Sequence, residues 1–228
     1  MLLRITNSLL LVLYLSASAV AQDFMSPQPG EWSANSIRLW PVNVSIDQRP
    51  SGVVVKSPRS RYAFTVTVKD LSEVKLTDLA KQKVVGTFPL MNLSLSEILW
   101  SPDERTFALT QSDGGWVGTW NLSIGQISDE GTLSFLNEID KVILADFKKR
   151  ILPKDCADEY PNVAAVAWVD SNKLLLVGEV PPHSSCSKMS AIFGYVVEIP
   201  SEKILNRIDE NTLSNEWKAW LGPRLKKK

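Results

Sequence analysis

The chain has 228 residues, with 25 Lys or Arg and 25 Asp or Glu, so that its formal net charge at pH 7 is zero. A neutral balance produces no long-range field that would gather nucleic acid or an anionic membrane surface, and neither partner is expected. Two cysteines and one histidine provide few soft ligands, so we predict no metal site and no cofactor.

The N-terminal residues have the pattern of a secretory signal peptide. Arg4 gives a basic start, Leu9–Leu15 (LLLVLYL) forms a short apolar run, and Ala19–Ala21 presents small residues at the spacing of a signal peptidase site. A membrane anchor is the less favoured alternative, because polar residues interrupt the run before the about 20 residues that span a bilayer. We therefore expect residues 1–21 to be removed, which leaves a secreted or periplasmic protein that does not span the membrane.

The next segments connect the signal peptide to the first regular structure. Residues 22–35 are rich in Pro, Ser and Gln and predict an irregular arm. Residues 36–47 alternate apolar and polar side chains, which predicts a half-buried strand, and Pro41 favours the edge of a sheet or a bulge. Together with the far end of the chain, this strand is the candidate for an additional sheet.

Residues 53–88 predict four short strands joined by polar turns, with Ser57-Pro58-Arg59-Ser60 as the first turn. Residues 97–127 contain the clearest copy of the same unit. There a strand ends at Trp100 and the turn Ser101-Pro102-Asp103-Glu104 follows, in which Pro pre-sets φ and Asp bonds back to the backbone. After a second strand, Asp113-Gly114-Gly115 predicts a hairpin that leads into a strand with Trp116 and Trp120.

An amphipathic helix is predicted at residues 135–151, between the second and third copies. Ser134 is a suitable N-cap, and apolar residues recur at steps of three and four from Phe135 to Ile151. Acidic residues lie early and basic residues late, as the helix dipole favours, and Pro153 ends the helix.

Residues 163–208 form the third copy, in which Trp168 takes the place of Trp100 and Asp170-Ser171-Asn172 carries the turn. A recurrence at about 40–45 residues, with four strands each time, is typical of propeller blades. The chain ends with residues 209–228, which predict a helix that places Trp217 and Trp220 on one face, followed by a solvated basic tail.

Cys156 and Cys186 are predicted to form a disulfide, because they are the only cysteines and the export signal implies an oxidising compartment. The bond would join the loop after the helix at 135–151 to the loop Pro181–Ser190 of the third copy. Two free thiols are the alternative.

The repeated unit resembles the blades of WD-repeat-like propellers, especially those of the periplasmic translocation protein of the bacterial Tol system. The resemblance rests on Trp100-Ser101-Pro102-Asp103 and its degenerate copies, and the usual turn Gly is replaced by Ser60, Glu104 and Asn172. It implies an all-β, propeller-like array of three to four antiparallel blades over residues 22–208, with one inserted helix and one C-terminal helix. Closed propellers contain at least about four blades, so the ring need not close.

The sequence contains no recognisable catalytic constellation. His183 is the only histidine, and although a relay with a neighbouring serine is formally possible, no Gly-x-Ser-x-Gly elbow is present and Pro181-Pro182 indicates a surface loop. Four acidic pairs occur at turns or helix starts, where capping is the simpler role. The pairs are Asp103-Glu104, Asp129-Glu130, Asp158-Glu159 and Asp209-Glu210.

We therefore predict an exported, non-catalytic module that binds a protein or a glycan, with no catalytic residue. The alternative is a cell-envelope hydrolase that uses the acidic turn residues as acid and base. The candidate ligand or partner surface consists of four tryptophans and the histidine. For the two tryptophans in a strand, packing in the core is the alternative role. For the two in the C-terminal helix, the alternative role is to cover an open face of a sheet. The residues of this surface are Trp116, Trp120, His183, Trp217 and Trp220.

Overall fold

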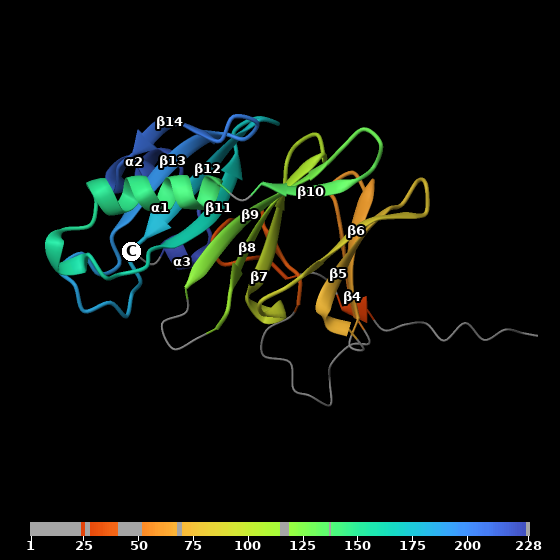
Figure 1. Ribbon diagram of the computed structural model, residues 1–228, viewed down its shortest axis with the longest axis horizontal. Helices are drawn as coiled ribbons and strands as arrows, with labels where there is room; N and C mark the ends of the chain where they lie inside the picture. The colour runs from red at the N-terminus through yellow and green to blue at the C-terminus, as the bar shows by residue number, and fades with distance from the viewer. Residues whose placement is uncertain are drawn as a thin grey trace, which may run out of the picture.

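The computed structural model describes residues 24–25, 28–40, 52–67, 70–114, 119–136 and 138–226. Within these ranges the chain forms three β-sheets, which follow one another in chain order from orange through green to blue in Figure 1, and three α-helices. The fold is all-β and propeller-like, and the described sheets form an open row. The predicted signal peptide and Trp116 lie outside the described residues.

The first blade (residues 52–89) covers the region of the first predicted copy. Its four main strands are antiparallel, and the short strand β1 (Phe24–Met25) adds to the β3 edge in parallel. Alternate residues such as Val55, Phe64 and Leu76 are buried and face the second blade. The main strands are β3 (Gly52–Lys56), β4 (Tyr62–Thr67), β5 (Asp70–Asp78) and β6 (Lys83–Pro89).

The second blade (residues 96–136) also has four antiparallel strands, and a fifth joins its edge. This fifth strand is β2 (Ile37–Arg38), which pairs antiparallel with β7. Of the edge strand predicted at residues 36–47, these two residues alone form a strand within the described part, and residues 41–47 lie outside it. Strand β2 belongs to the second blade, so among the described residues it does not form part of a fourth. The main strands are β7 (Ser96–Trp100), which follows the short 3-10 helix η2 (Leu93–Leu95), then β8 (Thr106–Ser112), β9 (Trp120–Ile127) and β10 (Leu133–Leu136).

The third blade (residues 162–208) is a four-stranded antiparallel sheet in simple chain order. Its first strand is apolar on both sides and almost wholly buried, because one face packs against the second blade and the other lies under the C-terminal segment. The strands are β11 (Asn162–Trp168), β12 (Lys173–Glu179), β13 (Ile192–Glu198) and β14 (Lys203–Ile208).

The turns after the first strands of the first two blades have the same geometry. Ser57 N donates to Tyr62 O at 2.9 Å, and Ser101 N donates to Thr106 O at 2.9 Å. The fourth turn residues, Ser60 and Glu104, both adopt positive φ, at 58° and 60°. These are the positions where the resembled family has glycine, so the equivalence inferred from the sequence also holds in the backbone.

The helix between the second and third blades is shorter than predicted. It is α1 (Ile139–Arg150), and the predicted start at residue 135 is wrong, because Leu133–Leu136 pairs with β9 as the last strand of the second blade. Phe135 lies 5.3 Å from Phe88, ring centre to ring centre, in the core between the first two blades. Strand pairing and this contact outweigh the helical periodicity.

Helix α1 fills the space beside the second and third blades. Its buried residues, Ile139, Ile143, Leu144 and Phe147, join a core cluster with β9, β11 and β12, and Figure 1 shows the helix lying along the third blade. None of the helices in the described part of the chain has the length and apolar character needed to cross a bilayer.

The predicted C-terminal helix ends earlier than expected: α2 (Glu210–Glu216) stops before Trp217 and Trp220. Part of the predicted basic tail forms a second short helix, α3 (Pro223–Lys226), in which Leu225 is buried. Asp209 caps α2 by accepting a hydrogen bond from Thr212 N at 2.9 Å, whereas Pro223 begins α3 because proline favours the first helical position. Leu213, Leu221 and Leu225 cover the face of the third blade that points away from the second. The C-terminal segment therefore occupies the place where a further blade would pack.

The predicted disulfide is confirmed: Cys156, at the end of the short 3-10 helix η3 (Lys154–Cys156), is bonded to Cys186. The two residues are separated by 30 positions, and the bond joins the loop after α1 to the loop between β12 and β13. Glu159 accepts a hydrogen bond from Ser184 Oγ at 2.6 Å, which holds the same two loops together.

We expect Cys156→Ser to lower the free energy of unfolding by about 3–4 kcal/mol, because a loop of about this length would no longer be closed in the unfolded chain. Urea unfolding measures the change, and the double variant Cys156→Ser, Cys186→Ser should match either single variant. An unchanged unfolding midpoint after reduction of the wild-type protein would contradict a stabilising role.

Candidate functional site

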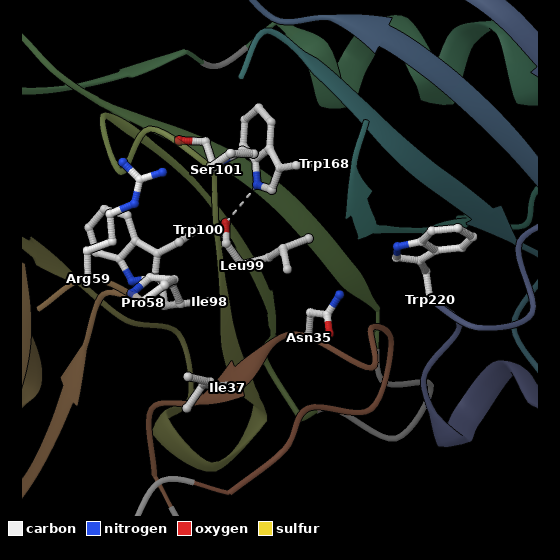
Figure 2. Close-up of a pocket in the computed structure, with 11 residues that line it drawn as sticks. Asn35, Ile37, Pro58, Arg59, Ile98, Leu99, Trp100, Ser101, Trp168 and Trp220 are labelled. Carbon is white, nitrogen blue, oxygen red and sulfur yellow. Dashed lines mark hydrogen bonds between the residues drawn. The ribbon is translucent and has the colours of Figure 1, made fainter. Parts of the chain in front are cut away.

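A cavity of about 360 Å³ opens where the first turns of the blades meet the N-terminal arm (residues 28–38) and the segment before α3. Figure 2 shows the side chains that line this turn cavity, with Trp220 lying across from Trp168, Trp100 and Pro58. The lining therefore combines all three blades with the N-terminal arm and the segment between α2 and α3. Apolar and aromatic side chains predominate, as they do in most ligand sites.

Trp100 and Trp168, which occupy equivalent positions in the repeat, both contact the preceding blade. Trp100 stacks on Tyr62 of the first blade with ring centres 5.9 Å apart. Trp168 donates a hydrogen bond from its indole Nε1 to Leu99 O of the second blade at 3.1 Å. Each indole thus fixes its own blade against the one before it and also forms part of the cavity lining.

The opposite side of the turn cavity is formed by Trp220, a residue that is 39% exposed. Its backbone carbonyl accepts a hydrogen bond from Ala34 N at 2.9 Å, and its ring lies 5.4 Å from that of Trp217. The backbone at Trp220 is therefore held in place while the ring remains accessible to a ligand.

Polar groups are few at the turn cavity. Arg59 is the one charged side chain among the described lining residues, and its exposed guanidinium makes no hydrogen bond or ion pair with another described residue. Its backbone N–H, by contrast, donates to the buried carboxylate of Glu104, which also accepts from Ser57 Oγ at 3.0 Å and so joins the first turns of two blades. With the exposed Asn35, the cavity offers an apolar slot with one cation and one amide at its rim.

The structure places the predicted surface residues in different environments. Trp220 lines the turn cavity, and the ring of Trp217 contacts the ring of Trp220. His183, by contrast, is exposed on the loop between β12 and β13, near the disulfide. Trp120 is only 4% exposed, so it belongs to the core and cannot form an accessible stacking surface. Trp116 lies outside the described residues.

The cavity also contains Asn35, Arg59, Trp100 and Trp168, which the sequence pattern did not indicate as a binding surface. The repeat did mark Trp100 and Trp168 as equivalent, but equivalence by itself does not tell a core role from a cavity role.

Trp120 contributes to a contact between the N-terminal arm and α3. Its ring lies 5.7 Å from that of Trp32, and the Arg224 guanidinium lies 4.5 Å from the centre of the Trp32 ring. Arg224 also donates to Glu179 Oε2 at 2.9 Å, and Glu179 in turn accepts from Asn162 Nδ2 at 2.9 Å. The buried carboxylate of Glu179 is thus paired and hydrogen-bonded, as a buried charge must be.

The backbones of the two segments are also hydrogen-bonded. Gly222 N donates to Trp32 O at 2.8 Å and Arg224 N donates to Glu31 O at 3.0 Å. At Gly222 a Cβ atom would lie 2.2 Å from Glu31 O, so only glycine permits this approach. We refer to the N-terminal arm and residues 217–226 together as the terminal clasp.

Glu97 on β7 lies beneath the arm and is 2% exposed. Its carboxylate accepts hydrogen bonds from Glu31 N at 2.6 Å and Trp32 N at 3.3 Å. Burial raises the pKa of Glu97 to about 7, although its hydrogen bonds with the Glu31 and Trp32 backbones and the Ser36 side chain act in the opposite direction. Burial therefore disfavours the charged form of the Glu97 carboxyl in the folded protein.

Each acidic pair of the sequence has a member that acts in a turn, a helix cap, an ion pair or a contact between loops. Asp103 accepts from Ser101 Oγ at 2.7 Å, and Asp129 forms an ion pair with Arg105. Glu104, Glu159 and Asp209 accept the hydrogen bonds described above. Among the residues that the structure describes, no three His, Cys, Asp or Glu side chains are grouped in a way that could hold a metal ion.

No protein-family model matches the chain, and no curated protein sequence matches it. Solved structures that resemble it include the β-propeller domain of Cps50 (Swd1) from Myceliophteria thermophila, at 5% identity and a TM-score of 0.36 over 68% of this chain and 42% of that one. Hydrazine synthase from Kuenenia stuttgartiensis gives 13% identity and a TM-score of 0.38, over 69% and 41% of the two chains. The Dos1 propeller gives 9% identity and 0.37, over 78% and 44%.

The chain spans less than half the length of each of these three structures. Because all three TM-scores are below 0.5, the fold of this protein is defined by its own strand order and pairing.

We expect Gly222→Ala to lower the free energy of unfolding by about 1–3 kcal/mol, since the new methyl group would push the backbone at Glu31 away from α3. Thermal unfolding measures this loss. The exposed α2 residue Ser214 supplies the control, because Ser214→Ala should change stability by less than about 0.5 kcal/mol. Equal stability of the two variants would show that the clasp does not need this close approach.

Proposed function

We propose that this protein is an exported, non-catalytic module that binds a segment of a partner protein in the turn cavity. The observation that carries the proposal is the accessible ring of Trp220, which lies across the cavity from the fixed ring of Trp168. Two indoles that bound one apolar slot can enclose a proline, aliphatic or aromatic side chain, and buried aromatic contacts of this kind dominate many protein interfaces.

The cavity walls are held in place before a ligand arrives. Trp168 is fixed by its hydrogen bond to Leu99 O, and the backbone at Trp220 is held by Ala34 N. A site whose walls are already ordered loses less conformational entropy on binding, so a small contact area can still give useful affinity.

The charge at the cavity rim favours a ligand with an acidic or hydrogen-bonding group. Arg59 can donate two parallel hydrogen bonds to a carboxylate, and Asn35 can pair with a peptide backbone. The resemblance of the repeat to Tol-type propeller blades supports a binding role in the cell envelope, although propellers as a class host both binding and catalysis.

The binding proposal can be tested with a phage-displayed library of random peptides, selected on the wild-type protein. We expect Trp220→Ala to raise the dissociation constant of the selected peptides about tenfold or more, because one wall of the slot would be lost. Leu205→Ala removes an exposed apolar side chain from β14, away from the turn cavity, and should leave the affinity unchanged. Fluorescence anisotropy with labelled peptides measures all three affinities.

Two results would overturn the proposal of a protein ligand. In the first, the selected peptides bind the Trp220→Ala variant with the same affinity as the wild type. In the second, the wild-type protein binds immobilised envelope glycans and the selection enriches no peptide.

Export is part of the proposal, and it is supported by the pattern of residues 1–21. When the full chain is produced in a bacterial host, we expect the mass of the exported protein to correspond to a chain that begins at Gln22. Ala21→Leu should block cleavage and leave the precursor in the membrane fraction, whereas Ala34→Leu, outside the signal peptide, should not. An exported protein that retains Met1 would refute the cleavage.

A further inference from the structure

The burial of Glu97 depends on the N-terminal arm. The groups that hydrogen-bond its carboxylate are Glu31 N, Trp32 N and the Ser36 side chain, and all three belong to the arm. Gly30 of the arm passes so close that a Cβ atom there would lie 2.3 Å from Glu97 Oε2. If the arm left β7, water would therefore reach this carboxyl.

We propose that docking of the arm onto β7 is linked to the uptake of a proton by Glu97. The arm therefore docks more tightly as the pH falls from neutral to mildly acidic values. The proton comes from water and resides on a Glu97 carboxyl oxygen. A protonated carboxyl can still accept a hydrogen bond from Glu31 N through its other oxygen, and it avoids the cost of a buried charge.

The sign of the effect follows from the two states of the carboxyl. With the arm docked, burial raises the Glu97 pKa to about 7, and with the arm released the carboxyl returns toward its ordinary value of 4.5. Between these values the docked state binds more protons than the released state. The docking equilibrium is therefore most favourable below pH 4.5 and weakens as the pH rises to about 7, by roughly 40-fold between pH 5 and pH 7.

The other charged groups at the clasp are paired with one another. Arg38 and Glu31, both on the arm, form an ion pair at 2.6 Å, and Arg224 on α3 pairs with Glu179 on β12 at 2.9 Å and lies 3.8 Å from Glu31. Arg38 is the weakest of the influences on the Glu97 pKa. These two cations and two carboxylates compensate each other, so Glu97 is the group through which docking responds to a proton.

The clasp also forms part of the turn cavity, because Asn35 and Ile37 of the arm line it. Release of the arm would remove this part of the lining and free the backbone at Trp220 from Ala34 N. A coupling of pH to ligand binding would rest on the proposed function, whereas the proton-linked docking of the arm does not.

Hydrogen exchange of the ligand-free, full-length protein tests the clasp directly. The backbone amides of Trp32 and Gly222 report arm docking, because they donate to Glu97 and to Trp32 O. After correction for the intrinsic exchange rate, we expect their opening equilibrium to rise roughly 40-fold from pH 5 to pH 7 in the wild type. In Glu97→Gln, which keeps an acceptor but cannot titrate, the opening should not vary with pH, whereas the exposed control Glu216→Gln should behave as wild type.

An equal pH dependence in Glu97→Gln and wild type, or none in wild type, would overturn the proposal. Carbon-13 NMR of the Glu97 carboxyl in the wild-type protein provides a readout that needs no variant. We expect its midpoint near pH 7, and an ordinary carboxyl midpoint would equally overturn the proposal. In Gly222→Ala, where the arm is pushed from α3, the midpoint should move back toward the ordinary value. Because no ligand is present, failure here leaves the peptide-binding proposal standing.

Discussion

The structure depends on covering both faces of each small sheet. A four-stranded sheet with apolar residues on its faces is unstable by itself, and here each blade buries a face against the next one. Between the first two blades the contact is largely aromatic, with Phe64 lying 4.9 Å from Phe107 and 5.0 Å from Trp100. Between the second and third blades the contact is aliphatic and includes α1. The row of blades follows from these two interfaces.

A row that is not a ring has ends, and the end at the third blade is covered by the chain itself. The leucines of α2 and α3, with Trp32 from the arm, fill the position of the missing neighbour. This cover brings the N-terminal arm and the C-terminal segment together, and it buries two carboxylates. Glu179 is paired with Arg224, whereas Glu97 is held mainly by N–H groups. The same convergence of arm, blade turns and C-terminal segment creates the turn cavity, so stability and the candidate site share residues.

Local patterns predicted the regular elements well where a single mechanism determined them. The Ser-Pro turns appear where expected, and Ser60 and Glu104 adopt the left-handed conformation that glycine usually takes. Prediction failed where a distant partner decided the outcome. Phe135 has helical spacing, but pairing of its segment with β9 makes it part of a strand. The C-terminal helix stops at Glu216, short of the predicted end, and the residues after it turn so that Gly222 bonds to Trp32 far away in the sequence.

The sequence by itself determined the all-β class, the repeated strand and turn pattern, and the pairing of Cys156 with Cys186, because these follow from side-chain alternation, turn chemistry and a count of two cysteines. Only the tertiary structure decided what each tryptophan does. Trp120 is enclosed beside Trp32, whereas Trp220 faces the turn cavity, although both are the same residue type in amphipathic segments. Burial depends on which distant segments meet, and no local pattern encodes the meeting of the arm with α3.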